Sequence, residues 1–236
     1  MTDWQTEIDA ASVADTACRL IGIAAREAIA ARGRFRLVLA GGTTPLVIYR
    51  RLAVSTQSWK RWSLYYGDER CLPADDPQRN STMVGKTGLA ARVGKHHPIP
   101  TELGAKAAAS AYRKRIAAAM PFDLVLLGMG EDGHTASLFP GHAWPDKSVF
   151  AVANSPKPPS QRVTLGVRAL QNCHSMLVLV TGESKTDAVR RWREGEPLPI
   201  AQVAATERAL VLVERNCLAF AGSQAASRSE GIKSGQ

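Results

Sequence analysis

Five short apolar runs recur along the chain, each of the length and composition of a strand that is buried on both faces. They span residues 34–40, 63–66, 124–127, 176–180 and 209–213, with a weaker candidate at 149–153. Segments with apolar residues at helical spacing lie between them, at 12–32, 44–54, 81–89, 105–120 and 185–194. This alternation predicts a parallel or mostly parallel sheet covered by helices on both faces, and hence an α/β fold.

Local signals indicate where several of these elements begin and end. Gly33 stands at the end of the first helical segment, where a glycine cap is common. Thr44 is suited to cap the second helix, with Pro45 in its first position, and Asn80 is suited to cap the third. The proline-rich stretch 156–159 predicts an exposed turn.

Four of the predicted strands end in polar clusters that contain glycine. The clusters are Gly41-Gly42-Thr43-Thr44-Pro45, Gly67-Asp68-Glu69-Arg70, the loop from Gly128 to His134, and Thr181-Gly182-Glu183-Ser184-Lys185. The carboxyl ends of parallel strands share one edge of a sheet, and ligands bind outside that edge. The sequence therefore predicts a functional site where these clusters meet.

The loop after the run 124–127 contains the main candidate for catalysis. Gly128, Gly130 and Gly133 enclose two acidic residues and lead to His134. A histidine near its ordinary pKa can act as a base and then as an acid at neutral pH. A lone histidine is more often structural than catalytic, but a glycine-rich loop at a strand end is not a typical core position. We therefore interpret His134 as the catalytic candidate.

The same three glycines also fit the GxGxxG pattern of dinucleotide-binding sites. That pattern requires a long following helix and an acidic residue about twenty positions further on. Pro140, Gly141 and Pro145 stop any long helix, and residues 151–155 include no acid. The sequence therefore argues against a dinucleotide site.

Two of the clusters have features that favour an anionic ligand. Gly41 and Gly42 let the backbone approach a ligand, free N–H groups at a helix start point toward it, and Thr43 adds a hydroxyl donor. Lys185 lies in the first turn of a predicted helix, where a lysine is unfavourable for the helix dipole unless it faces an anion. Without further information, a plain glycine turn explains the first cluster equally well.

Composition limits the classes of function. The 236 residues are 45% hydrophobic, enough for one domain over residues 1–221, and a tail rich in Ser and Gly at 222–236 is expected to be disordered. The net charge of +9 is scattered and no nucleic-acid-binding motif is visible, which favours a small anionic substrate and no nucleic-acid partner. No run is long enough to span a membrane and no signal peptide is visible, so we expect a cytoplasmic protein without a membrane partner.

The remaining cysteines and histidines offer little chemistry. The four cysteines are far apart in the sequence: Cys18, Cys71, Cys173 and Cys217. This spacing predicts reduced thiols rather than a disulfide framework or a zinc site. Cys71 follows Arg70, and a neighbouring cation favours the thiolate, but no base adjoins it, so it is a weak nucleophile candidate. His96 and His97 lie in a polar segment and are expected to be ordinary surface residues.

The segment DLVLLGMGEDGHTASLFPG, residues 123–141, resembles the signature of the 6-phosphogluconolactonases. The similarity continues in the family's order through GGTTP at 41–45, GDER at 67–70, RVT at 162–164 and GESK at 182–185. It implies a three-layer α/β/α sandwich with a mostly parallel Rossmann-like sheet. It also implies hydrolysis of 6-phospho-D-glucono-1,5-lactone to 6-phospho-D-gluconate, without a cofactor or a metal.

The resemblance also implies roles for individual residues. His134 is the expected base and acid, Asp132 or Asp68 orients it, and Arg70 or backbone N–H groups stabilise the oxyanion. The residues expected to bind the phosphorylated sugar lactone are Gly41, Gly42, Thr43, Asp68, Arg70, Gly130, Arg162 and Lys185. Two segments depart from the family's pattern, since Asn80-Ser81 replaces Ser-Asn and LPIA at 198–201 replaces LPAS.

Three alternatives remain for this site. A glucosamine-6-phosphate deaminase carries an acid before the proline of the histidine loop, but that position is Phe139 here. A non-catalytic sugar-phosphate sensor needs a DNA-binding segment, and only about ten residues precede the first helix. A metal site of Asp132, His134 and His142 is disfavoured because Pro140 prevents one helix from presenting both histidines.

For the oligomeric state of the protein, we expect a monomer.

Overall fold

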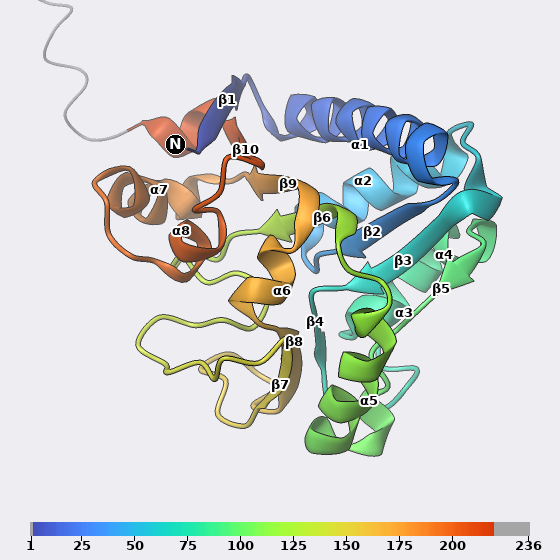
Figure 1. Ribbon diagram of the computed structural model, residues 1–236. Coiled ribbons are helices and arrows are strands. Elements are labelled where there is room, and N and C mark those ends of the chain that lie inside the picture. Colours follow the sequence, from blue (N-terminus) through green and yellow to red (C-terminus); the bar gives the residue numbers. More distant parts are fainter. Residues whose placement is uncertain (1, 220–236) are drawn as a thin grey trace, which may run out of the picture.

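The central element of the fold is a parallel sheet, seen in the computed structural model, which describes residues 2–219 (Figure 1). Within those residues, seven strands form it in the order β1-β10-β9-β6-β2-β3-β5, and every neighbouring pair is parallel. The strands are β1 Asp3–Glu7, β2 Phe35–Leu39, β3 Trp62–Tyr66, β5 Lys95–His96, β6 Phe122–Gly128, β9 Cys173–Val180 and β10 Ala209–Glu214. The predicted α/β sandwich with a mostly parallel sheet is confirmed, whereas the tail predicted at 222–236 lies outside the described residues.

Helices flank this sheet (Figure 1). They are α1 Ala10–Arg32, α2 Thr43–Val54, α3 Asn80–Lys86, α4 Leu89–Arg92, α5 Ala105–Ala117, α6 Val167–Gln171, α7 Thr186–Arg193 and α8 Pro199–Val203. The longest helix, α1, packs across β2, β6, β9 and β10. Among residues 2–219, no helix is both long enough and apolar enough to cross a membrane.

Small residues on one stripe of α1 explain how it lies flat on the sheet. Ala17, Ala25 and Ala28 are almost fully buried together with the larger Ile21, so the helix backbone comes close to the strands. The Asp9 side chain accepts a hydrogen bond from the Ser12 N–H at 2.7 Å and caps the first turn. The predicted glycine cap is confirmed, since Gly33 has a left-handed φ of 70° and closes the last turn.

A second, smaller sheet has antiparallel strands in the order β4-β8-β7. Its strands are β4 Asp68–Arg70, β7 Val149–Val152 and β8 Arg162–Leu165. Gly67 alone separates β3 of the large sheet from β4 of the small one. The cluster after β3, predicted only as the polar end of that strand, therefore includes a further strand that belongs to the second sheet.

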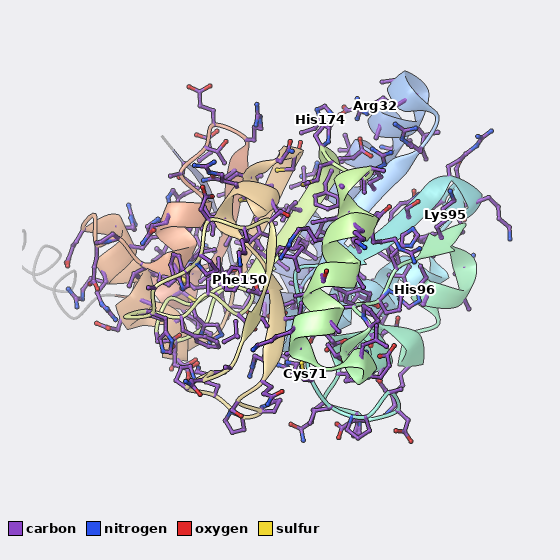
Figure 2. The ribbon with its side chains drawn as sticks, turned by 60° about the horizontal axis from the view of Figure 1, so that its bottom comes forward. Arg32, Cys71, Lys95, His96, Phe150 and His174 are labelled. Carbon is purple, nitrogen blue, oxygen red and sulfur yellow. The ribbon has the colours of Figure 1, made fainter. Side chains whose placement is uncertain are left out.

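Two predictions about histidines and helix starts are wrong. His96 is half-buried in β5, where its Nε2 lies 2.7 Å from the Tyr66 hydroxyl oxygen, and the ring of His97 stacks on Tyr65 (Figure 2). Neither is an ordinary surface residue, because both side chains pack beside β3. Helix α2 begins at Thr43 rather than after Thr44.

Candidate active site

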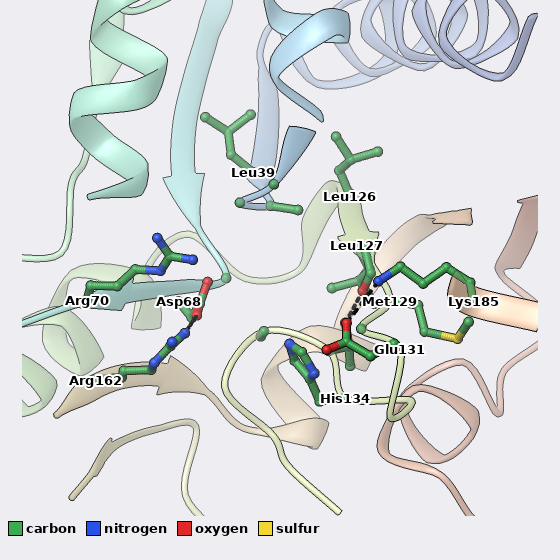
Figure 3. Close-up of a pocket in the computed structure, with 18 residues that line it drawn as sticks. Leu39, Asp68, Arg70, Leu126, Leu127, Met129, Glu131, His134, Arg162 and Lys185 are labelled. Atoms are coloured by element: carbon green, nitrogen blue, oxygen red, sulfur yellow. Dashed lines mark hydrogen bonds and ion pairs between the residues drawn. The ribbon is translucent and has the colours of Figure 1, made fainter. Parts of the chain in front are cut away.

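The carboxyl ends of the neighbouring strands β2, β3 and β6 open into a pocket of about 210 Å³ (Figure 3). Most of the residues singled out from the sequence line it: Gly41, Gly42, Asp68, Arg70, Gly130, His134, Arg162 and Lys185. Thr43 and Asp132 are not part of its wall. The predicted meeting of the strand-end clusters at one edge is confirmed.

His134 is held by Asp132 in an arrangement that suits a general base. The Nδ1 atom of His134 lies 2.5 Å from Oδ1 of Asp132, which also accepts the His134 backbone N–H at 3.2 Å. A carboxylate on Nδ1 requires the proton there, and Nε2 has no hydrogen-bond partner among residues 2–219. Of the two carboxylates considered from the sequence, Asp132 therefore orients the ring.

The electrostatics leave this histidine neutral at pH 7. Burial lowers the pKa of His134, and the hydrogen bond and charge of Asp132 offset only part of that effect. Burial, the largest single effect, raises the pKa of Asp132, but its hydrogen bonds to the side chain and backbone of His134 and the charges of His134 and Lys157 together leave that pKa below its ordinary value. The pair is thus a neutral imidazole beside a carboxylate, which is the protonation state that a base needs.

The glycines of the loop have a steric function. A Cβ on Gly130 would lie 2.0 Å from Nδ1 of His134, so a side chain there would displace the imidazole. The Gly130 N–H donates to the His134 carbonyl at 2.8 Å, and Gly133 adopts a left-handed φ of 81°. Gly130 therefore belongs to the site because only glycine leaves room for the ring. No helix follows this loop before β7, in line with the rejection of a dinucleotide site.

Asp68 is a buried residue of the pocket wall whose carboxylate forms several hydrogen bonds. It accepts hydrogen bonds from Ser137 Oγ at 2.6 Å and from Asn80 Nδ2 at 2.9 Å. Its Oδ2 also lies 3.8 Å from Nη1 of Arg162. These contacts fix β4 against the histidine loop and against β8.

Glu69, rather than Asn80, caps helix α3. Its two carboxylate oxygens accept the backbone N–H groups of Asn80 at 2.7 Å and Ser81 at 2.8 Å. The side chain is fully buried and lies 3.8 Å from Arg79. The prediction that Asn80 caps this helix is wrong, because its amide is used to bond Asp68.

The two arginines of the pocket differ in how far their donors are already used. Arg162 donates to the carbonyl oxygens of Lys157, Pro158 and Pro159 at 2.8–3.2 Å, so most of its guanidinium supports that loop. Arg70 donates from Nη1 to the Gln78 carbonyl oxygen, while its buried Nε has no partner among residues 2–219. Its Nη2 also donates to no group among those residues, and because the side chain lines the pocket, Arg70 retains donor capacity there.

The start of α2 presents free donors. The backbone N–H groups of Gly42, Thr43 and Thr44 have no hydrogen-bond partner among residues 2–219, as expected for the first turn of a helix. Gly42 precedes the helix with a left-handed φ of 111°. The Thr44 hydroxyl lies 2.5 Å from that of Thr181, which joins the helix start to the end of β9.

Two residues at the pocket mouth were not singled out from the sequence. Glu131 lines the pocket, and one of its carboxylate oxygens lies 3.3 Å from Nζ of Lys185 (Figure 3). Its other carboxylate oxygen lies 2.5 Å from Nζ of Lys157, which is outside the pocket wall. The hydrogen bond to Lys157 is the main reason that the pKa of Glu131 falls to about 2. Lys157 lies between prolines, a context that predicted only an exposed turn.

The other candidate groups do not form a second site. Burial raises the pKa of Cys71, so its thiolate is disfavoured in spite of the preceding arginine (Figure 2). All four cysteines are free. Within residues 2–219, no group of three or more His, Cys, Asp or Glu side chains could hold a metal ion.

Comparison with known proteins shows the family of the chain. Residues 8–212 match the family described as glucosamine-6-phosphate isomerases/6-phosphogluconolactonase. The chain belongs to this family. The 6-phosphogluconolactonase of Mycobacterium tuberculosis is 36% identical over 231 residues, which cover 88% of this chain and 93% of that protein.

Solved structures of this family share the fold. The 6-phosphogluconolactonase of Thermotoga maritima superposes with a TM-score of 0.83 and 30% identity, over 91% of this chain and 100% of that one. A monomeric glucosamine-6-phosphate deaminase superposes with a TM-score of 0.77 and 21% identity, over 91% of this chain and 98% of that one. The second likeness shows the fold alone, so the fold does not distinguish the two activities within the family.

Proposed function

We propose that this chain is a 6-phosphogluconolactonase, which hydrolyses 6-phospho-D-glucono-1,5-lactone to 6-phospho-D-gluconate. The observation that carries the proposal is the neutral His134, fixed through Nδ1 by Asp132 at 2.5 Å, in a pocket lined by cationic side chains. Its relatives in several organisms have the same name.

The proposed reaction uses His134 first as a base and then as an acid. Nε2 takes a proton from a water molecule, and the water oxygen attacks C1 of the lactone to give a tetrahedral oxyanion. Arg70 lines the pocket, and its unused terminal nitrogen Nη2 stabilises that oxyanion. When the bond from C1 to the ring oxygen breaks, the imidazolium returns the proton to the leaving oxygen. Asp132 stabilises the transient positive charge on the ring.

The proposed phosphate site lies on the side of the pocket that is lined by the start of α2 and by Lys185. Free N–H groups at a helix N-terminus favour an anion, and Gly41 and Gly42 in the pocket wall allow close approach. Lys185 contributes a full positive charge from the next cluster. Thr43 adds its backbone donor, although its side chain is not in the wall. Arg162 acts mainly by holding the loop 157–159.

One residue argues for the lactonase over the deaminase activity. The position before Pro140, where the deaminases carry an acid, is the buried Phe139. Its ring packs against His134 with a centroid distance of 4.8 Å, and the Arg162 guanidinium lies 5.6 Å from its centre. The apolar ring supplies no carboxylate to assist ring opening.

We also propose that the enzyme acts as a cytoplasmic monomer without a nucleic-acid partner. One continuous apolar core runs from Val13 to Cys217, which supports a single domain. Light scattering during size-exclusion chromatography would test the monomer.

The decisive experiment measures proton release from freshly generated 6-phosphogluconolactone at neutral pH. It compares no protein, wild type and His134→Ala, because the lactone also hydrolyses unaided. We expect His134→Ala to lower kcat/KM by at least about 100-fold. Ammonium release from glucosamine-6-phosphate would instead indicate the deaminase. A wild type that matches the blank but binds 6-phosphogluconate would be a sugar-phosphate sensor.

A further inference from the structure

The carboxylate of Glu131 occupies a position at the pocket mouth that suits an anionic ligand. It bridges two ammonium groups from distant parts of the chain, Lys185 at 3.3 Å (Figure 3) and Lys157 at 2.5 Å. Lys185 follows β9, whereas Lys157 belongs to the loop between β7 and β8. Two lysines from separate elements therefore converge on one point, and that point borders the pocket.

The loop that carries Lys157 is held firmly by its backbone. Arg162 donates to the carbonyl oxygens of Lys157 and Pro158 at 3.2 and 2.8 Å. The Ser155 hydroxyl donates to the Lys157 carbonyl at 2.7 Å, and the Ser155 N–H donates to the Ser160 carbonyl at 2.9 Å. None of these bonds uses the Lys157 ammonium, which reaches Glu131 in the pocket wall from a fixed backbone.

Glu131 is a replaceable partner for these lysines. Its side chain is 56% exposed, so it can turn to solvent, and ion pairs at such exposed positions are weak. A phosphate group carries nearly two negative charges and three acceptor oxygens, so it pairs with two ammonium groups more strongly than one carboxylate does. The lysines, by contrast, are 33% and 19% exposed and remain near the pocket.

We propose that the phosphate of the substrate replaces Glu131 between Lys157 and Lys185. Lys157 is then a phosphate-binding residue, and Glu131 is a built-in competitor that lowers the affinity for phosphorylated ligands. The proposal rests on the proposed function for the nature of the ligand. Glu131 also keeps the two ammonium groups in place while the pocket is free, so the phosphate enters a prepared site.

Calorimetric binding of 6-phosphogluconate, with gluconate as the ligand without phosphate, tests the competitor. At low ionic strength we expect Glu131→Gln to bind 6-phosphogluconate about tenfold more tightly, because one negative charge near the phosphate is removed. Asp187→Asn is the matched control, since it removes an exposed carboxylate paired with Arg190 and Arg191 outside the pocket wall. Unchanged or weaker binding by Glu131→Gln overturns the proposal.

Lys157→Met tests the second half of the proposal, because methionine keeps the apolar stem and removes the charge. We expect it to bind 6-phosphogluconate about tenfold more weakly at low ionic strength, while thermal melting shows an intact fold. Unchanged binding of 6-phosphogluconate by this variant overturns the role of Lys157. Both tests measure binding without turnover, so a protein that binds 6-phosphogluconate but does not hydrolyse the lactone fails only the proposed function.

Discussion

The hydrogen bond between Asp132 and His134 determines which ring nitrogen is free to act as a base. In Asp132→Asn, the amide can donate to Nδ1, which moves the ring proton to Nε2 and removes the base. We expect kcat/KM to fall by about 100-fold or more. The carboxylate raises the pKa of His134, so its loss lowers that pKa further, and the acid limb of the pH profile moves to lower pH. A fully active variant with an unmoved limb would contradict this role.

Helix α3 is capped by Glu69, a residue of the strand β4. Glu69 accepts the N–H groups of Asn80 and Ser81 while fully buried. In Glu69→Gln, the amide NH₂ faces one of these donors, so we expect the free energy of unfolding in urea to fall by about 2 kcal/mol. Glu102→Gln is the control, because that carboxylate is 51% exposed and its loss should cost less than about 1 kcal/mol. Equal effects of the two variants would contradict the capping role.

The same elements show what the sequence could and could not predict. The buried strands β2, β3, β6 and β9 are mostly apolar, so their identity and the shared edge followed from local pattern. Strand β1 has the polar sequence DWQTE and forms only because β10 offers a free edge. The β4 strand likewise depends on pairing with β8, which lies about ninety residues further on. Long-range pairing of this kind leaves no local signal.

The residues of the site likewise fall into those that the sequence could reveal and those that only long-range contacts bring together. His134 and the glycines of its loop were recognisable because their chemistry is local in sequence. The bridge from Glu131 to Lys157 and Lys185 was not, because its partners are brought together only by the sheet and by the loop before β8. Asn80 was misassigned for the same reason, since a remote carboxylate outcompetes it as a cap.

At the scale of the whole molecule, three partly buried histidines couple stability to pH. Burial is the main cause that lowers the pKa of His96, His97 and His134 below the ordinary value of 6.5. Nearby Arg115 and Lys95 lower the pKa of His97 further. The unfolded chain therefore takes up protons at a pH where the folded chain does not. The contribution of these histidines to the free energy of unfolding is present above about pH 6.5. It is lost as the pH falls from there through their pKa values in the folded chain.

We therefore expect the midpoint of urea unfolding to decrease between pH 7.5 and 5.5. Burial raises the pKa of Glu69, so proton uptake by that carboxylate in the folded chain opposes the decrease but involves one group against three histidines. The carboxylates with lowered pKa, such as Asp132 and Glu131, contribute only at lower pH, because their ordinary values are 3.8 and 4.5. Replacing both His96 and His97 with Gln should flatten the decrease, whereas His174→Gln, at an exposed position on β9 (Figure 2), should not. A midpoint that stays constant in the wild type over this range would show that these histidines do not govern the coupling.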